Sequence, residues 1–403
     1  MDPTRPTPNE RLTELDWLRI LAFGLLILYH VGMYYVRWDW HVKSPHPVPA
    51  LEAWMSWLNP WRMPLLFLIS GAATTLLAGP DGGRHLAGPR TRRLLAPLLF
   101  GMAVVVPPQA YLQVVEQWHY AGSYADFLGL YFRAYHGFCR DGRCLDLPTW
   151  NHLWFVAYLW IYTLLLALLW RWRGGWTQAP GWAQWTQGAR LLWLPWLLLA
   201  VWRQQLLHHF PPSNDLVHDF YNHALYGTVF VLGAALFGQR DDCHGAWAAA
   251  LRLRWWALAT ALAAQLLMMF AWSALDGRND VPDSLTMALR TLNALRQWAP
   301  IVAALGFARA HLAGRDGPAR RWLTQAVFPF YIVHQTLIVL AAPWLARRGL
   351  PQAIEAALLV AFTALGCVLV FFVVRRVPVL ATCMGVDRSR NRRGAGSAII
   401  RTS

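Results

Sequence analysis

Residues 16–35 read DWLRILAFGLLILYHVGMYY, an apolar stretch of helix length that carries Asp16, Arg19 and His30. An α-helix turns ~100° and rises ~1.5 Å per residue, so Arg19 and His30 share one face and Asp16 lies close beside it. If Arg19 lies at one edge of the hydrocarbon, His30 lies ~17 Å deeper, near the middle of a core ~30 Å thick. Ionisable side chains at that depth usually line a pathway or a site. The alternative is a structural hydrogen bond between packed helices.

The composition predicts an all-α fold, a polytopic bundle of transmembrane helices. Of the 403 residues, 56% are hydrophobic and only 14% are charged, whereas a soluble domain carries about 25% charged residues. Repeated apolar runs of about 20 residues suit membrane-spanning helices. The formal net charge of +15 comes mainly from arginines in alternate loops. That distribution follows the positive-inside rule and argues against a nucleic-acid partner.

The arginine-rich loops predict about ten spans with both termini in the cytoplasm, and nine or eleven spans are the alternatives. The first apolar run is interpreted as a retained span, because it holds arginine and histidine and no cleavable signal peptide is evident. The predicted domains are a disordered tail at 1–14, one membrane domain at 15–377 and a basic tail at 378–403. The expected spans cover about residues 16–35, 54–77, 94–112, 152–170, 191–207, 220–237, 255–272, 285–310, 325–346 and 354–374.

Two cysteines, Cys139 and Cys144, fall in one loop that this topology places outside. An oxidising compartment would allow a disulfide between them, and two free thiols are the alternative. The other cysteines form no metal-ligand spacing, so the sequence predicts no metal site.

Further polar groups extend the pattern of the first span. Tyr331 and His334 share a face of the ninth predicted span, with His334 at about mid-membrane depth. Arg90 and Arg93 lie on the cytoplasmic side, where arginine forks suit phosphates. The alternative is that these arginines only mark the cytoplasmic side of the membrane. On the outer side, aromatic and histidine rings suit a sugar, or else form an interfacial aromatic belt. These rings belong to Trp38, Trp40, His41, His152 and Trp154.

Together these groups describe a route with an anionic carrier inside, a histidine in the middle and a polar acceptor outside. A neutral imidazole can take the proton of a hydroxyl as that hydroxyl attacks an acyl carbonyl. The same groups are consistent with a transporter or flippase that uses a histidine proton relay. A transporter would more often show broken helices and a repeat, and Pro64 with Ser70–Gly71 could mark one break. A structural partner of a glycan-synthesis complex is a third alternative.

Four sequence blocks in this order resemble the membrane acyltransferase-3 family, over nearly the whole chain but thinly from 170 to 320. The blocks are Leu15-Asp16-Trp17-Leu18-Arg19 with His30 after ten residues, Arg62-Met63-Pro64 with Ser70-Gly71, His152-Leu153-Trp154-Phe155, and Phe330-Tyr331 with His334. Within the family, residues 40–44 with Arg90 and Arg93 are most similar to the branch that succinylates periplasmic glucans. Gln335 departs from that branch, which often has a second histidine there, and Ala72 stands where many relatives have an aromatic residue.

The resemblance implies a multi-pass enzyme of the bacterial inner membrane that transfers a succinyl or acetyl group from cytoplasmic acyl-CoA. The acceptor would be a hydroxyl of a periplasmic glucan, and O-acetylation of another glycan is the alternative. Acyl-CoA would be a co-substrate, and a homo-oligomer is left open. The predicted catalytic residues are His30 as general base, Asp16 or a neighbour setting its tautomer, and His334. Arg19, Arg90 and Arg93 would hold CoA phosphates. The predicted acceptor-side and passage residues are His41, Arg62, Ser70, His152, Trp154 and Tyr331.

Overall fold

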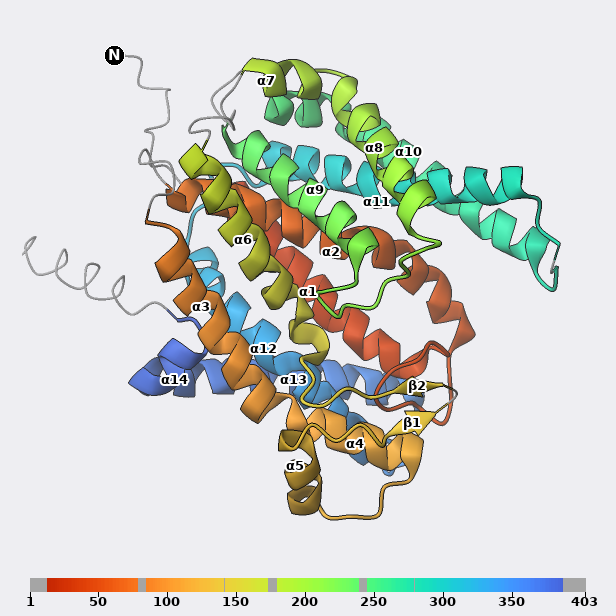
Figure 1. The fold of residues 1–403 in the computed structure, drawn as a ribbon, viewed down its shortest axis with the longest axis vertical. Helices are drawn as coiled ribbons and strands as arrows, with labels where there is room; N and C mark the ends of the chain where they lie inside the picture. Colours follow the sequence, from red (N-terminus) through yellow and green to blue (C-terminus); the bar gives the residue numbers. More distant parts are fainter. Residues whose placement is uncertain are drawn as a thin grey trace, which may run out of the picture. The chain divides into compact units, whose positions relative to one another are not determined.

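The computed structural model describes residues 13–78, 85–140, 142–172, 180–238, 245–278 and 280–386. The predicted tails therefore lie largely outside the described residues. Helices dominate the described chain, which confirms the all-α fold, and one short hairpin is the exception (Figure 1). The elements are α1 (Thr13–Tyr35), α2 (Pro49–Ala78), α3 (Ala87–Phe100), the π-helical turn η1 (Gly101–Val105), α4 (Pro107–Trp118), α5 (Tyr124–Phe132), β1 (Cys139–Arg140), β2 (Arg143–Cys144), the 3-10 turn η2 (Asn151–Leu153), α6 (Trp154–Trp172), α7 (Pro180–Thr186), α8 (Arg190–Leu206), α9 (Phe220–Gly238), α10 (Ala246–Leu275), α11 (Asp283–His311), α12 (Pro318–Ala346), α13 (Gln352–Arg376) and α14 (Pro378–Cys383).

Within the described residues, 7 helices are long and apolar enough to cross a membrane, or 8 if the bent pair α3–α4 forms one span. They are α1, α2, Asn151–Trp172, α9, α10, α12 and α13. The chain is therefore a multi-pass membrane protein. Each of the ten expected spans corresponds to a helix or to a bent pair of helices, but α8 has only 17 residues and α11 carries Arg290 and Arg296 in its first half. The count of ten and the cytoplasmic termini stay predictions.

The third expected span is a bent helix. Ala87–Val105 and Pro107–Trp118 meet at 44°. Proline lacks the backbone N–H that would continue the helical ladder, and the π-turn just before it widens the helix by one residue. In contrast, α2 runs without interruption through Pro60 and Pro64. Pro64 and Ser70–Gly71, which could have marked a broken helix in a transporter, thus lie in a continuous helix, and the bend lies in the next span instead.

The chain folds into two compact units, each assembled from three separate segments. Unit 1 comprises Met1–Ala22, Trp57–Arg84 and Leu168–Thr324, and unit 2 comprises Phe23–Ser56, His85–Ala167 and Gln325–Ser403. The boundaries fall inside α1, α2, α6 and α12, so four helices supply residues to both units.

Unit 1 is held together by close helix packing. Gly71 on α2 and Gly233 on α9 have no side chain, and a Cβ on either would overlap backbone of the opposite helix. On α11, the buried Trp298 indole donates a hydrogen bond of 2.8 Å to the Leu191 carbonyl of α8. Small residues thus let these helices approach closely, as is common between membrane helices.

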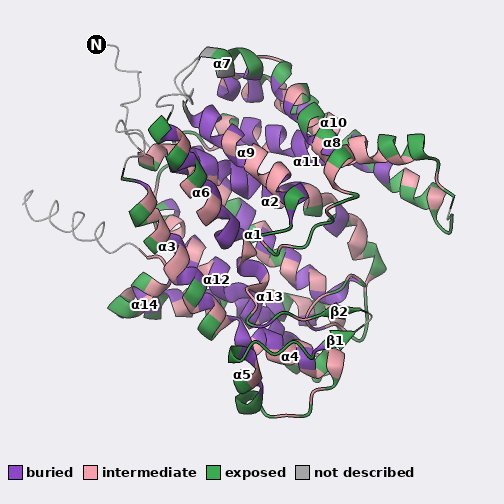
Figure 2. Ribbon diagram, in the orientation of Figure 1, coloured by how far each residue is buried: buried purple, intermediate pink, exposed green. Residues whose placement is uncertain are grey.

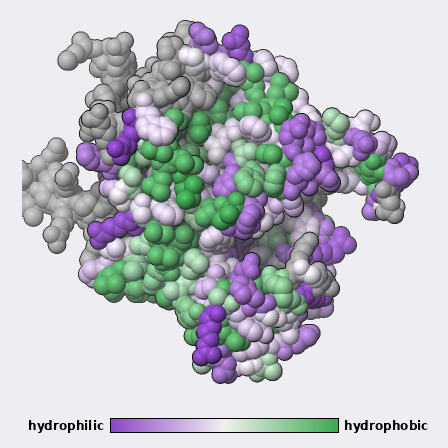
Figure 3. Space-filling model, viewed as in Figure 1, coloured by the Kyte–Doolittle hydropathy of each residue, from purple (hydrophilic) through white to green (hydrophobic). Residues whose placement is uncertain are grey.

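Unit 2 has a core between α1, α12 and α13. Val31, Tyr34, Ile338, Ala342 and Leu359 are its buried centre, and Figure 2 shows the corresponding buried surface of α12. Figure 3 shows hydrophobic side chains on the face formed by α3 and α6. Leu99 on α3 and Leu165 on α6 are large hydrophobic residues that are more than half exposed. Apolar side chains that face outward in this way suit contact with lipid.

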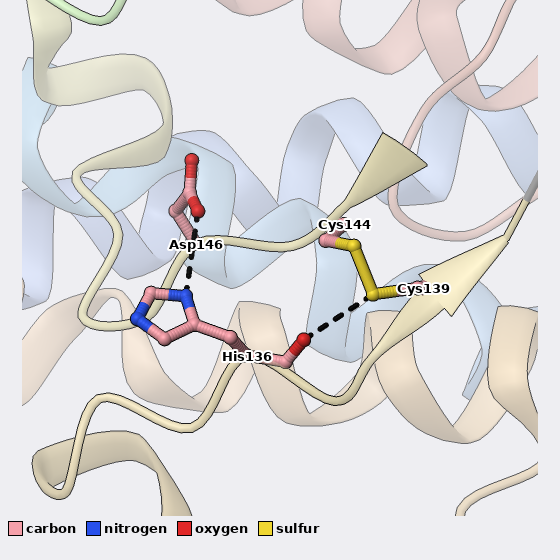
Figure 4. The surroundings of a disulfide bond; sticks show 4 residues. All are labelled: His136, Cys139, Cys144 and Asp146. Atoms are coloured by element: carbon pink, nitrogen blue, oxygen red, sulfur yellow. Dashed lines mark hydrogen bonds and ion pairs between the residues drawn. A yellow bond between two sulfur atoms is a disulfide. The ribbon is translucent and has the colours of Figure 1, made fainter. Parts of the chain in front are cut away.

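The loop after α5 forms the hairpin β1–β2, which a disulfide between Cys139 and Cys144 closes (Figure 4). Of the two alternatives left open by the sequence, the structure therefore has the disulfide. At its base, His136 and Asp146 lie 3.6 Å apart, measured from Nδ1 to Oδ1. Phe138 anchors the hairpin in an aromatic cluster with Phe127 and Tyr131 of α5.

Candidate active site

Two histidines from helices far apart in the sequence meet inside unit 2. The Nδ1 atom of His30 on α1 lies 2.7 Å from the Nε2 atom of His334 on α12. The two rings are nearly parallel, with centroids 5.0 Å apart and an interplanar angle of 12°. His334 is fully buried, whereas His30 is partly exposed. The structure thus brings together two of the three residues predicted to be catalytic.

The neighbours of His334 determine which nitrogen of each ring carries a proton. Its Nδ1 lies 2.7 Å from the Tyr331 carbonyl oxygen and 3.2 Å from that of Phe330. Carbonyl oxygens only accept, so Nδ1 donates and Nε2 of a neutral His334 must accept. The Nδ1 atom of His30 then donates to it, which leaves the lone pair of His30 on Nε2. This inferred tautomer makes Nε2 of His30 the atom that can take a proton.

Tyr331 and His152 support this pair. The Tyr331 hydroxyl donates to the His152 carbonyl, and Nε2 of His152 lies 3.1 Å and 3.0 Å from the carbonyls of Tyr331 and Ile332. The His152 ring meets the His334 ring edge to face at 5.2 Å. These bonds tie η2 to α12, so both residues fix the orientation of His334. A predicted contact with substrate for either of them stays a prediction.

Trp40 is also nearly parallel to His30, with ring centroids 6.4 Å apart and an interplanar angle of 20°. Trp40 belongs to the loop between α1 and α2, and its neighbour His41 points toward Gln113 and Gln335. The sequence offers both rings either as sugar contacts or as part of an aromatic belt, and contact with a sugar stays a prediction. In the structure Trp40 lies beside His30. Trp154 contacts Tyr158, with ring centroids 5.3 Å apart.

The charged residues at the start of α1 belong to unit 1. The Asp16 carboxylate pairs with Arg320 and lies 3.6 Å from Arg19. Arg19 also donates to the Thr324 carbonyl at 3.2 Å. The partners of Asp16 are therefore arginines. The atom that accepts the hydrogen bond from Nδ1 of His30 is Nε2 of His334. The tautomer-setting role proposed for Asp16 or a neighbour thus fits the neighbour, His334.

The remaining predicted residues are divided between the units. In unit 1, Arg62 on α2 interacts electrostatically with Tyr226, and the Ser70 carbonyl accepts a 2.7 Å hydrogen bond from Thr74. In unit 2, Arg93 is exposed on α3 and Arg90 is partly buried. An exposed guanidinium next to a partly buried one is compatible with phosphate binding, which stays a prediction.

Sequence reasoning missed a buried polar cluster in unit 1. Arg203 donates to the Tyr221 hydroxyl at 2.6 Å, and Arg296, only 2% exposed, donates to Gln265 at 2.8 Å. Gln297 lies beside the same tyrosine hydroxyl. The only signal in the sequence was the presence of Arg203 and Arg296 inside apolar runs.

The fold is that of a multi-pass membrane protein that holds a hydrogen-bonded pair of histidines, and comparison with known proteins gives its class. The family model described as an acyltransferase domain matches residues 12–375. The chain belongs to the acyltransferase-3 family and is a membrane acyltransferase.

Among curated proteins, the chain is similar to glucans biosynthesis protein C of Salmonella typhi, with 25% identity over 172 residues, which is 41% of this chain and 40% of the relative. The protein of the same name from Escherichia coli (strain SMS-3-5 / SECEC) is 26% identical over 165 residues, 40% of this chain and 39% of the relative. The chain thus aligns with about two fifths of the length of these relatives. No solved structure matches the chain.

Proposed function

We propose that this chain moves a succinyl or acetyl group from cytoplasmic acyl-CoA to a hydroxyl of a periplasmic glucan or another glycan, within the bacterial inner membrane. The observation that carries the proposal is the hydrogen-bonded pair of His30 and His334, whose tautomers leave a basic nitrogen on His30. The name of the similar proteins, glucans biosynthesis protein C, supports a glucan acceptor.

In the proposed reaction, the acceptor hydroxyl oxygen forms a bond to the thioester carbonyl carbon while its proton passes to Nε2 of His30. The imidazolium is stabilised because Nδ1 of His30 already donates to His334, as in other base–orienter pairs. The carbon–sulfur bond then breaks, and the thiolate takes the proton from His30. The products are an acyl ester and free CoA, and His30 returns to its starting tautomer.

The predicted binding residues have distinct roles in this scheme. Arg19, Arg90 and Arg93 would hold the phosphates of CoA at the cytoplasmic mouth. On the acceptor side, a glycan would contact His41, Arg62, Ser70, His152 and Trp154. Tyr331 would line the passage with His334.

Purified protein in detergent, mixed with acyl-CoA and a glucan without any gradient, tests the proposal directly. Acyl ester formation that disappears in His30→Ala supports it. The competing transporter or flippase, for which the bend at η1 is the one favourable observation, would show no transfer without two compartments. Full acylation activity in the His30→Ala variant would contradict the proposed role of His30 as general base. Mass spectrometry of periplasmic glycans, with and without the protein, identifies the acyl group and the acceptor.

A further inference from the structure

We propose that Gln335 and Gln109 are positioning residues that hold the loop between α1 and α2 so that Trp40 lies against His30. Neither glutamine belongs to the predicted site. The role of this arrangement in catalysis rests on the proposed function, whereas the positioning itself does not.

The two glutamines form a buried chain of amide hydrogen bonds inside unit 2. The side-chain nitrogen of Gln335 lies 2.7 Å from Nε2 of His41 and 3.0 Å from the side-chain oxygen of Gln109. Gln109 is fully buried and Gln335 is 2% exposed. The oxygen of Gln109 also accepts from Asn151 at 3.1 Å, and its nitrogen donates to Thr336 at 2.6 Å.

The direction of each hydrogen bond follows from Thr336, the last residue in this series of hydrogen bonds. The Thr336 hydroxyl donates to the Val105 carbonyl at 2.7 Å, so it must accept from the amide nitrogen of Gln109. The oxygen of Gln109 is therefore the acceptor for Gln335. The second hydrogen of the Gln335 amide then points to Nε2 of His41, which must carry the lone pair.

His41 is consequently neutral with its proton on Nδ1, which donates to Gln113 at 2.7 Å. Burial lowers the pKa of His41, in agreement with the neutral form. Both ring nitrogens are occupied, so His41 fastens the loop to α4 and α12. The backbone on both sides of this ring is also held, because Gln117 donates to the Trp40 carbonyl at 2.7 Å and to the His41 carbonyl at 3.4 Å.

This attachment determines where the Trp40 ring lies. The indole is nearly parallel to the His30 ring, with 6.4 Å between centroids. The face of an indole attracts a cation, so it favours the imidazolium that forms when His30 takes a proton. Loss of the amide chain would let Trp40 leave this position without any change to His30 or His334.

The experiment compares Gln335→Met and Gln113→Met, which each remove one partner of His41 at nearly constant volume, with the control Gln352→Leu. Gln352 binds the same loop at the His46 carbonyl, outside the amide chain. Lys43 lies in this loop and is the only lysine of the sequence, so labelling by an N-hydroxysuccinimide ester, measured on its peptide by mass spectrometry, reports how often the loop opens.

We expect both methionine variants to label Lys43 about fivefold faster or more, because a lost buried hydrogen bond costs about 1 kcal/mol or more of local stability. We also expect kcat to fall about tenfold with an unchanged KM for acyl-CoA. Trp40→Phe should lower kcat without faster labelling, and Gln352→Leu should change neither.

Wild-type labelling and kcat in both Gln335→Met and Gln113→Met would overturn the proposal. If one variant does not fold, the other decides. If the wild-type enzyme transfers no acyl group from any donor, the proposed function fails, while the labelling result still decides the positioning role.

Discussion

At the residue scale, the central feature is a series of hydrogen bonds that determines the tautomers of two imidazoles. His334 is held by backbone carbonyls of its own helix, and His30 takes its tautomer from His334. The sequence indicated that both histidines lie at mid-membrane depth. It did not indicate that they touch, because equal depth does not specify which helices are neighbours. The Gln335 network was also beyond prediction, since its donors and acceptors come from four separate segments.

Replacing His334 with phenylalanine keeps a buried ring but removes the acceptor for Nδ1 of His30. We expect His334→Phe to lower kcat by about 10²-fold or more, since a wrongly oriented base loses most of its contribution. Initial rates of ester formation check this prediction. The matched control is His209→Phe in an exposed loop, which should retain wild-type kcat. Equal rates in both variants would contradict the role of His334.

Lys43 provides a pH-dependent test. Burial lowers the pKa of Lys43 from 10.5 to about 8, against the opposing effect of Asp39 and Glu52. Only the neutral amine reacts with acylating reagents, so we expect labelling of Lys43 to rise through a midpoint near pH 8 in the folded protein. In denaturant the midpoint should return toward the ordinary lysine value.

The same shift affects stability. Between pH 8 and 10.5 the unfolded chain binds more protons at Lys43 than the folded chain does. The contribution of Lys43 to the free energy of unfolding therefore increases with pH in this window. A folded-state labelling midpoint above pH 10 would show that the amine is solvated.

At the element scale, hydropathy and arginine placement predicted six of the ten long helices to within three residues at both ends, whereas α2, α3, α10 and α12 begin five to nine residues earlier than expected. What they could not predict is how helices meet. Gly71 and Pro64 suggested a broken helix, yet α2 is continuous and Gly71 instead gives α9 room to approach. A glycine in a sequence is consistent either with a bend in its helix or with close approach of a second helix. Only the structure shows which of the two roles it has.

We expect Gly233→Ala to destabilise unit 1 by about 2–4 kcal/mol, because its Cβ would overlap the Leu68 carbonyl and force the helices apart. Thermal unfolding in detergent measures the loss. Gly24→Ala on α1 is the control, since no atom lies within 4 Å of its added Cβ. That variant should be neutral or slightly stabilised by higher helix propensity. A wild-type melting temperature for Gly233→Ala would refute the close contact.

At the scale of the whole molecule, the two compact units interleave along the chain, and no single stretch of sequence encodes either of them. The sequence predicted one membrane domain because no linker or change in composition separates the segments. Contacts between residues hundreds of positions apart define the units, as His30 with His334 and Asp16 with Arg320 illustrate. Such contacts leave no local pattern in a single sequence.

The disulfide tests the orientation of the whole chain in the membrane. Disulfides persist on the oxidising side, so the hairpin should face the periplasm. We expect Cys139 and Cys144 to resist alkylation in protein purified from membranes until a reductant is added. Cys383, which is not in a disulfide and is partly exposed, should react without reductant. Peptide mass spectrometry distinguishes the sites. Alkylation of Cys139 without reductant would place the hairpin in a reducing compartment.

The π-turn η1 determines which side chains of α4 face α12. Because η1 holds an extra residue in its turn, Gln109 on α4 is rotated by ~100° relative to its place on an uninterrupted helix. That rotation presents Gln109 to Gln335 and lets the Val105 carbonyl accept from Thr336. Deleting Ala103 would remove the extra residue of the π-turn while changing no polar side chain. The deletion would nevertheless detach the loop that carries Trp40, so the spacing of residues 101–105 is itself part of the active-site architecture.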